Sequence, residues 1–204
     1  MAPLHRPALK LLSISDIEDK TLIQGVENKS FPPVDLILSC GDLPPEYLAF
    51  LRDRLDAPLF YIKGNHDIRY SSANPLGCHN IHGKLITFKG RHILGLEGSA
   101  WYNGGENQYT EREMKKFIRR LWFPLWRKKP LHLVITHAPP RHIHDREDPC
   151  HQGFHCFNTL IQRHRPEFFI HGHIHQSFDA PEDRETRVGN TRIINTCGSM
   201  LLEI

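Results

Sequence analysis

The sequence predicts an α/β domain built around a largely parallel sheet. Short apolar runs alternate with amphipathic stretches along the chain, which is the order that parallel strands joined by helices require. Two pairs of short runs, joined by Lys89-Gly90-Arg91 and by Gly189-Asn190, predict antiparallel hairpins added to this sheet. The chain of 204 residues has the length of a single domain, residues 1–204, and is long enough to form a proper core.

The strands are predicted from apolar runs that are bounded by polar residues, glycine or proline. They are Leu9–Ser15, Val34–Ser39, Leu59–Ile62, Lys84–Phe88, His92–Leu96, Leu131–Thr136, Phe168–Ile170, Thr186–Val188, Thr191–Asn195 and an edge strand at Met200–Ile204. Two stretches rich in polar residues, Ile68–Asn80 and Trp101–Tyr109, are expected to be loops.

Four helices are predicted between these strands. A short one covers Thr21–Val26, another begins at Pro44-Pro45 because proline suits a first turn and runs to Leu55, and a third covers Phe154–His164. The clearest helix opens at the capping box Thr110-x-x-Glu113, and Pro124 is expected to end or kink it. Its apolar face at helical spacing consists of Met114, Phe117, Ile118, Leu121 and Trp122.

Polar residues that can bind a metal directly follow several of the predicted strands. Ligands of open α/β sheets bind at the carboxyl ends of the strands, so we expect these side chains to converge. In the densest stretch, Gly64-Asn65-His66-Asp67, glycine permits a sharp turn, the amide supplies a neutral oxygen ligand, and Asp67 can hold His66 in one tautomer. The full set is Asp16, Asp42, Asn65, His66, His137, His173 and His175.

This mixture of carboxylate, amide and imidazole groups is typical of two divalent ions about 3.5–4 Å apart that share a bridging carboxylate. Burying so many carboxylates and imidazoles without a metal would cost free energy. The 15 histidines are also a surplus for a chain of this length, and histidine is a common metal ligand. The sequence therefore predicts a dinuclear metal centre.

The chain resembles the calcineurin-like metallophosphoesterase family from about Leu9 to the C-terminus, on the stretches Asp16-x-x, Gly41-Asp42, Gly64-Asn65-His66-Asp67, Thr136-His137 and Gly172-His173-x-His175. This resemblance implies a four-layer α/β/β/α sandwich of two mixed sheets, with the metal site at the carboxyl ends of the strands. It implies that Asp42 bridges the two ions and that Asp16 and His175 complete one site. Asn65, His137 and His173 would complete the other site, and His66 would face the leaving group, oriented by Asp67.

One position departs from the pattern of the family, which usually has Asp-x-His after the first strand where this chain has Asp16-Ile17-Glu18. Two interpretations stay open. Glu18 replaces the imidazole as a ligand, which lowers the positive charge of the site by one and favours Mn²⁺ or Mg²⁺ over Zn²⁺. Alternatively Glu18 points away, and that ion binds weakly or is held partly by water. We expect two divalent ions, with Mn²⁺ ahead of Fe, Zn²⁺ and Mg²⁺.

The expected reaction is hydrolysis of a phosphomonoester or phosphodiester bond without a covalent enzyme intermediate. A water that bridges the ions, acidified to a pKa of roughly 7, would supply hydroxide for an in-line attack on phosphorus. His66 would protonate the departing oxygen, a role worth about 10²–10⁴-fold in rate. The expected catalytic residues are therefore His66 and Asp67.

The loop from Pro139 to Gly153 is rich in histidine and basic residues. We expect it to overhang the metal site, with Arg141 or His151 in contact with the phosphate of a substrate; the alternative is a mobile surface loop. A zinc knuckle that uses Cys150 and Cys156 is a weaker hypothesis, because the spacings do not match the usual zinc-binding patterns.

Two other functions stay open. The first is a protein of the same fold that binds metal and a nucleotide but has little turnover because of Glu18. The second is nucleic-acid binding through the basic face of the helix that begins at Thr110. We do not expect the second, because Phe117 and Trp122 are predicted to lie on the apolar face rather than among the basic residues, where they could stack with bases.

The expected partner is a small phosphoester, with nucleotides among the candidates. No apolar run approaches the length that spans a membrane, so we expect no membrane partner. The five cysteines form no CxxC pair, and the N-terminus lacks the pattern of a signal peptide. Both observations indicate a cytoplasmic protein.

Overall fold

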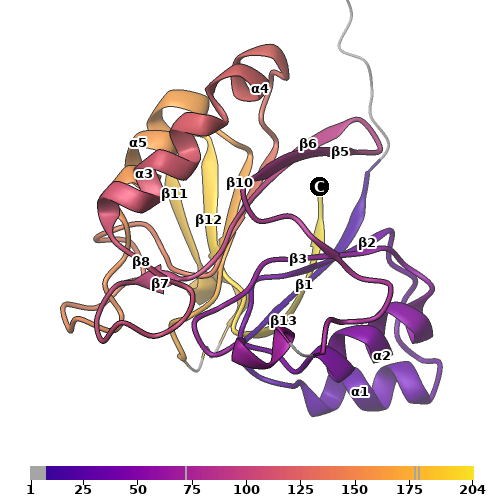
Figure 1. The fold of residues 1–204 in the computed structure, drawn as a ribbon. Coiled ribbons are helices and arrows are strands. Elements are labelled where there is room, and N and C mark those ends of the chain that lie inside the picture. Colours follow the sequence, from indigo (N-terminus) through magenta and orange to yellow (C-terminus); the bar gives the residue numbers. More distant parts are fainter. Residues whose placement is uncertain (1–7, 72, 177, 179) are drawn as a thin grey trace, which may run out of the picture.

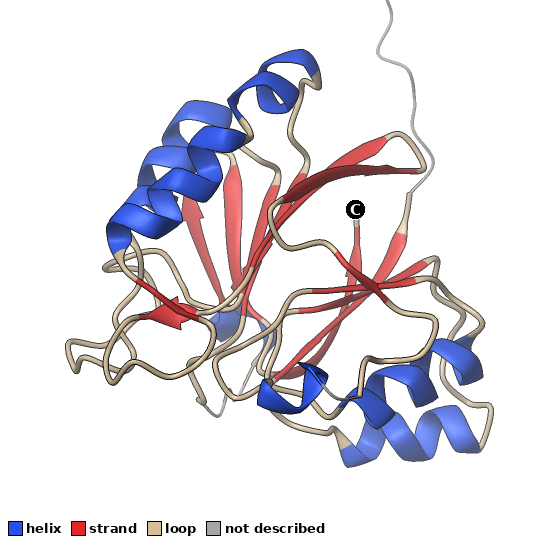
Figure 2. Ribbon diagram, in the orientation of Figure 1, coloured by secondary structure: helices blue, strands red, loops and turns tan. Residues whose placement is uncertain are grey.

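The structure is a computed structural model that describes residues 8–204 apart from 72, 177 and 179. Within these residues the strands form a five-stranded, a six-stranded and a two-stranded sheet (Figures 1 and 2). The five-stranded sheet has the order β13-β1-β2-β3-β4, and the six-stranded sheet has the order β11-β12-β10-β9-β6-β5. Parallel and antiparallel pairs occur in both large sheets, so both are mixed.

The observed strands follow the predicted ones closely. In the five-stranded sheet they are β13 (Gly198–Glu203), β1 (Lys10–Ser15), β2 (Leu36–Ser39), β3 (Leu59–Tyr61) and β4 (His79–Asn80). In the six-stranded sheet they are β11 (Glu185–Val188), β12 (Thr191–Asn195), β10 (Phe168–His171), β9 (Leu133–Thr136), β6 (Arg91–Leu96) and β5 (Lys84–Phe88). The short β7 (Ser99–Ala100) and β8 (Gln108–Tyr109) pair in parallel beside them.

Helices cover the outer face of each large sheet (Figure 1). The five-stranded sheet packs against α1 (Lys20–Glu27) and α2 (Pro45–Leu55). The six-stranded sheet packs against α3 (Glu111–Arg120), α4 (Trp122–Arg127) and α5 (His155–His164). The two sheets face each other across a third apolar layer, so the predicted four-layer α/β/β/α sandwich is confirmed.

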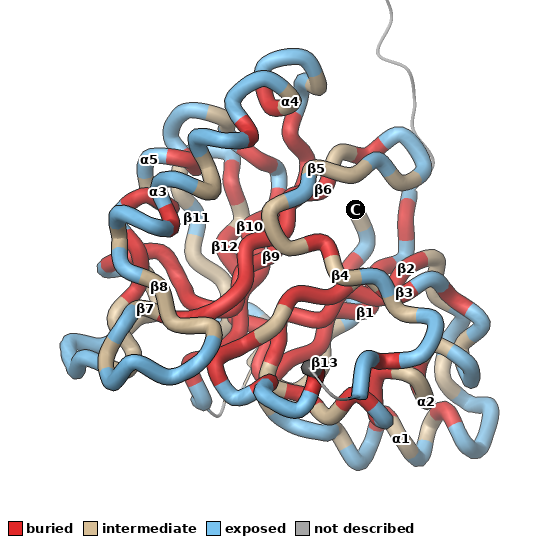
Figure 3. The backbone as a smooth tube through the Cα atoms, viewed as in Figure 1, coloured by how far each residue is buried: buried red, intermediate tan, exposed pale blue. Residues whose placement is uncertain are grey.

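The continuously apolar strands are explained by burial on both faces. On β1, Leu11 lies in the layer between the sheets, whereas Leu12 packs against α1 and α2. On β9, Ile135 lies between the sheets and Val134 faces the helices on the other side. Side chains alternate across a strand, so a strand with helices on one face and a sheet on the other is buried at nearly every position and is mostly apolar. The buried centre and the exposed helix faces are visible in Figure 3.

Three predictions about local structure need correction. The two stretches expected to be loops contain short regular elements: a 3₁₀ helix at Ile68–Ser71 and β4 in the first, and β8 in the second. The helix that begins after Thr110 ends at Arg120, and Pro124 lies inside a separate helix, α4, in its first turn, where proline is tolerated. This break turns Trp122 outward, and its side chain is 68% exposed rather than packed in the core.

The two large sheets bring the carboxyl ends of their parallel strands to a common edge. Asp16, Asp42 and Asn65 follow β1, β2 and β3 of the five-stranded sheet, and His137 and His173 follow β9 and β10 of the six-stranded sheet. The site that these residues form therefore lies across the junction of the sheets. No helix in the described part of the chain is long and apolar enough to cross a membrane.

Candidate metal centre

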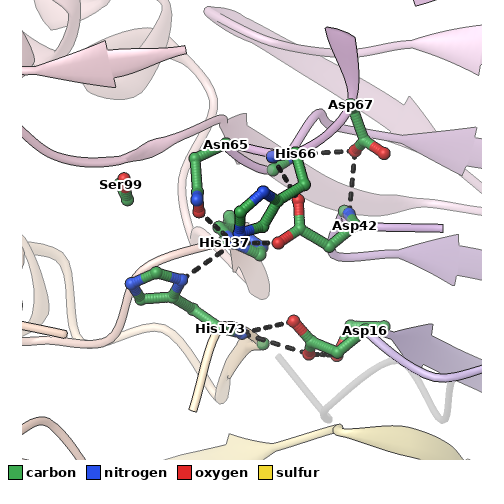
Figure 4. Close-up of polar contacts among 12 residues, drawn as sticks. Asp16, Asp42, Asn65, His66, Asp67, Ser99, His137 and His173 are labelled. Carbon is green, nitrogen blue, oxygen red and sulfur yellow. Dashed lines mark hydrogen bonds and ion pairs between the residues drawn. The ribbon is translucent and has the colours of Figure 1, made fainter. Parts of the chain in front are cut away.

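Four of the predicted ligand residues converge around one ring nitrogen (Figure 4). His137 Nε2 lies 3.2 Å from Asp42 Oδ2, 3.0 Å from Asn65 Oδ1 and 3.1 Å from His173 Nδ1. One ligand atom from each of Asp42, His137 and His173 lies within 4.8 Å of the others. Four separate strand ends supply the four side chains, so the arrangement depends on the whole fold rather than on a local motif.

The polar atoms of His137, His173 and Asn65 that face away from the cluster form hydrogen bonds of their own. These bonds orient the side chains so that their lone pairs point into the cluster. His137 Nδ1 lies 2.8 Å from the carbonyl oxygen of Cys40, and His173 Nε2 lies 2.8 Å from the carbonyl oxygen of Cys150. A carbonyl oxygen only accepts, so each ring donates its N–H there and turns its other nitrogen toward the cluster. Asn65 Nδ2 donates to the Tyr102 hydroxyl, which leaves Oδ1 facing His137.

When His137 is neutral, two imidazole nitrogens, a carboxylate oxygen and an amide oxygen face one another with no proton between them. Acceptors that face acceptors in a buried place repel each other unless a cation lies among them. A divalent ion satisfies all four lone pairs, and these donor types suit Mn²⁺, Fe²⁺ and Zn²⁺. The residues present therefore fit a metal ion.

The electrostatics of the cluster agree with this interpretation. Burial favours neutral His137, but the charge of Asp42 and its hydrogen bond outweigh burial and raise the pKa of His137 above its usual value. Burial also opposes ionisation of Asp42, but the same interaction with His137 lowers the pKa of this carboxyl group. Burial and the neighbouring His137 lower the pKa of His173 to about 3, so this ring is neutral near pH 7. Without a metal, a proton on His137 Nε2 takes the position of the cation.

The backbone at the site adopts an uncommon conformation. Asp16, Asp42 and His173 have φ values of 65°, 56° and 69°, in the left-handed region that residues other than glycine seldom adopt. Each such residue costs about 1–3 kcal/mol unless its surroundings compensate. Gly64 allows a close approach as well, because a Cβ there would lie 2.1 Å from Asp42 Oδ1. Three of the ten non-glycine residues with positive φ in the described part of the chain are therefore predicted ligands.

A second, looser group lies beside the first. Asp16 accepts hydrogen bonds from the backbone N–H of His173 at 3.0 and 3.1 Å, and its side chain is fully buried. His175 Nε2 lies 3.4 Å from Asp16 Oδ1, but the His175 side chain is 60% exposed. Glu18 is exposed beside Tyr47, and the described contacts do not bring it to Asp16 or His175. Of the two interpretations of Glu18, this placement favours the one in which it points away.

His66 and Asp67 do not act on each other as we expected. His66 is exposed, and its backbone N–H donates to Asp42 Oδ1 at 2.8 Å. Asp67 is buried, and its Oδ2 accepts the backbone N–H groups of Gly64 at 2.7 Å and Asp42 at 2.8 Å. The described contacts include none between the two side chains. Asp67 therefore ties the loops after β2 and β3 together instead of orienting the His66 ring.

The two predicted substrate contacts differ in their placement. The guanidinium of Arg141 is bound by Asp145 at 2.7 Å and by Glu147 at 2.6 Å, so the loop's own carboxylates engage this cation. The prediction that Arg141 contacts substrate is therefore not supported by its geometry. His151 does border the centre, because its ring lies 5.4 Å from that of His173, measured between centroids. His151 Nδ1 also lies 2.8 Å from Asp148 Oδ1.

Several features of the site were not predicted from the sequence. Tyr102 fixes the orientation of the Asn65 amide, and the carbonyl groups of Cys40 and Cys150 fix the two ring tautomers. No sequence pattern identifies these residues, since a carbonyl group belongs to every residue and Tyr102 lies in an irregular loop. The zinc knuckle receives no support: among the described residues, the side chains that converge as closely as a metal requires do not include Cys150 or Cys156.

Comparison with known proteins adds the following findings. The sequence profile of the family described as "Calcineurin-like phosphoesterase" matches residues 13–177. No curated protein matches the sequence.

Solved structures show the same fold at low identity. One crystal structure shares 19% identity with a TM-score of 0.66, covering 97% of this chain and 95% of its own. The protein TT1561 of Thermus thermophilus shares 16% identity with a TM-score of 0.61, covering 94% of this chain and 90% of its own. GAP50, described as the anchor in the inner membrane complex of Plasmodium, shares 14% identity with a TM-score of 0.50, covering 94% and 71%.

Proposed function

This chain belongs to the calcineurin-like phosphoesterase family, and on that premise we propose that it is a dimetal-dependent hydrolase of phosphoric monoesters or diesters. The observation that carries the proposal is the convergence of Asp42, Asn65, His137 and His173 with their lone pairs turned inward. These inward lone pairs need a cation or a proton among them, because unpaired buried polar groups destabilise a protein, and a divalent ion can bind all four groups at once.

The chain offers donors for two ions. Asp42, Asn65, His137 and His173 would hold the inner ion, and Asp16 and His175, with Asp42 shared between the two, would hold the outer one. Divalent ions bound there supply an acidified water and neutralise charge on the phosphoryl oxygens. We propose Mn²⁺ as the metal ahead of Fe, Zn²⁺ and Mg²⁺. With Glu18 exposed, we base the preference for Mn²⁺ over Zn²⁺ on the oxygen ligands alone.

The residues around the site can position an ester and move a proton. A shallow cavity of about 180 Å³ beside Asp42 is lined in part by His66, Asp67 and Arg69. His66 is exposed there, and its backbone is fixed by Asp42, so its imidazole is free to reach the oxygen of a leaving group. We propose that His66 delivers the proton to the departing alkoxide, a role worth about 10²–10⁴-fold.

The test is turnover of p-nitrophenyl phosphate and bis-p-nitrophenyl phosphate by protein that has been stripped with a chelator and then reloaded. We expect activity to return with Mn²⁺ and to be abolished by Asn65→Ala. His66→Ala should lose more activity on esters with poor leaving groups than on the nitrophenyl esters. Retention of full activity in Asn65→Ala, or without any divalent ion, would contradict the proposal.

A second candidate function is a metal- and nucleotide-binding protein with little turnover. The exposed position of Glu18 favours it, because an outer ion without the imidazole usual in the family has fewer protein ligands. In that case nucleotides would bind in a metal-dependent way, measurable by calorimetry, while both nitrophenyl esters remained intact. We further propose small phosphoesters as ligands and the cytoplasm as the location, which is supported by the five free cysteine thiols.

A further inference from the structure

Three aromatic side chains on α4 are displayed to solvent as a group. Trp122, Phe123 and Trp126 are 68%, 47% and 64% exposed. Their rings lie against one another, with centroids 5.7 Å apart for Trp122 and Phe123 and 6.1 Å apart for Phe123 and Trp126. We call these three residues the aromatic tip. Single exposed apolar residues are ordinary on protein surfaces, but a contiguous cluster of this kind indicates an interaction site.

The fold holds the aromatic tip outward. Leu121, the residue that precedes α4, and Leu125 within α4 are 8% and 2% exposed and pack into the core with α3 and α5. Residues four apart share one face of a helix, so anchoring Leu121 and Leu125 places Trp122 and Trp126 together on a neighbouring exposed face. Turning the rings inward would require these leucines to leave the core. The display is therefore a property of the packed structure.

Basic residues precede and follow the aromatic tip in the sequence, and we call them its positive rim. Residues 111–130 contain eight basic and two acidic residues, a net charge of +6, whereas the whole chain carries +3, so the other residues carry a net charge of −3. The two acidic residues lie at the start of α3, where Glu113 closes the capping box and Glu111 pairs with Lys115. Among the described residues, the ion pairs include none for the exposed basic residues nearest to the tip: Arg119, Arg120, Arg127 and Lys129.

An aromatic cluster within a cationic rim matches the surface of a bilayer that contains anionic lipids. Tryptophan and phenylalanine partition into the interface between headgroups and acyl chains, and arginine and lysine bind lipid phosphates around them. Stacking with single-stranded nucleic acid fits less well, because the three rings contact one another and leave no space for a base between them. Self-association fits less well too, because two copies would bring their positive rims together.

We propose that α4 docks the protein on the surface of an anionic lipid bilayer, with the aromatic tip inserted into the interface. In sequence, α4 precedes the amino end of β9, while His137 follows its carboxyl end, so the docked face and the metal centre lie at opposite ends of this strand (Figure 3). The metal centre then remains open to water. This inference revises our expectation of no membrane partner, which considered only segments that span a bilayer.

The test is sedimentation of the full chain with phosphatidylcholine vesicles that do or do not contain phosphatidylglycerol. We expect binding only to the anionic vesicles and a decrease with added salt, because screening shortens electrostatic interactions to about 10 Å at 0.1 M. Trp122→Ser with Trp126→Ser should weaken binding by about tenfold or more for each side chain. Trp101→Ser is the matched control, since Trp101 is 58% exposed but lies outside α4, and it should bind like the wild type.

A second pair of variants isolates charge. Replacing Arg119, Arg120 and Arg127 with glutamine should weaken binding by about fivefold for each charge, because a basic residue near an anionic surface contributes about 1 kcal/mol. Replacing Lys20, Lys29 and Arg54 with glutamine removes the same charge from the region of α1 and α2 and should have a much smaller effect. Turnover of soluble esters should be unchanged in all these variants, which separates this inference from the proposed hydrolase activity.

Three outcomes would overturn the inference. The first is equal binding to neutral and anionic vesicles, or binding that the tip variants leave intact. The second is tighter binding to a single-stranded oligonucleotide than to vesicles, lost in the same variants, which would assign the surface to nucleic acid. The third is a concentration-dependent dimer in light scattering that disappears with Trp122→Ser and Trp126→Ser, which would assign it to a second copy of the chain.

Discussion

The two groups of predicted metal ligands differ in how completely the protein builds them. In the inner group, the side chains of His137 and Asp42 are 0% and 6% exposed, and each polar atom has a fixed partner. In the outer group, Asp16 is buried, but His175 is 60% exposed and Glu18 lies at the surface. The inner group is therefore organised before any ion binds, whereas the outer group must order an exposed side chain when an ion binds.

The fold by itself therefore builds the inner ion position, whereas the outer position depends on an exposed side chain. Organising ligands in advance raises affinity because less conformational entropy is lost on binding. The inner position should thus be filled first and hold its ion most tightly.

His137→Ala should have the largest effect, because it removes the nitrogen on which the inner group converges. We expect metal-dependent turnover to fall by about 10³-fold or more, since one lost electrostatic contact at an active site already costs about 10²–10³-fold. The measurement is kcat/KM with Mn²⁺, with circular dichroism to verify folding. If a folded His137→Ala protein retained more than a tenth of the wild-type activity, the inner group would not be the essential one.

Asp67 tests what holds the inner group together. Asp67→Asn keeps an oxygen that can accept the N–H groups of Gly64 and Asp42, but it removes a buried charge. Burial raises the pKa of Asp67 from 3.8 to about 6, so the folded protein binds more protons than the unfolded chain between these values. The stability that protonation of Asp67 contributes is therefore present below pH 3.8 and is lost as pH rises through about 6.

Without metal, the gain in unfolding free energy of Asp67→Asn over the wild type should thus be small below about pH 4, grow between pH 4 and pH 6, and reach about 1–3 kcal/mol above about pH 6. Denaturant unfolding across this range measures the gain. Asp67→Ala, which leaves both N–H groups without their acceptor, should instead lose about 1–3 kcal/mol. Equal stability of the wild type and Asp67→Asn at all pH values would show that the charge of Asp67 does not lower the free energy of unfolding.

Metal titration compares the two positions directly. We expect the first equivalent of Mn²⁺ to bind at least about tenfold more tightly than the second, which corresponds to about 1.4 kcal/mol. Calorimetry on chelator-treated protein measures both affinities, and Asn65→Ala should remove the tighter one selectively. Equal affinities for the two ions would show that the inner group does not bind its ion more tightly than the outer group.

Glu18 should show the smallest effect. Because it is exposed and away from Asp16, Glu18→Ala should change turnover by less than about threefold, as surface substitutions do. Glu18→His supplies the imidazole that the family usually has at this position and should tighten the second ion several-fold. A large loss of activity in Glu18→Ala would show that this carboxylate turns inward when an ion binds.

The sequence allowed the architecture and the converging donors to be predicted for one physical reason. Strands such as β2 and β9, buried on both faces, are apolar up to their last residue, so polar residues directly after them mark the carboxyl edge of a sheet. Asp42, Asn65, His137 and His173 could therefore be assigned to one place without knowledge of distances. Recognition of the family and of its fold is confirmed.

Other features depend on contacts that no local pattern encodes. Arg141 could not be assigned to Asp145 and Glu147 instead of a phosphate, because all three lie in an irregular loop. The outward position of Trp122 depends on the break between α3 and α4, which changes the helical phase after Arg120. The exposure of Glu18 is set by the path of the chain into α1, and spacing alone could not reveal it.

The inner donors come from both sheets of the sandwich, and this has a mechanical consequence. Asp42 and Asn65 belong to the five-stranded sheet, while His137 and His173 belong to the six-stranded sheet. Apolar packing between the sheets has no preferred direction, so by itself it resists separation more than it resists sliding. An ion bound by donors from both sheets, with a defined coordination geometry, would add a directional link between the sheets and fix the angle between them.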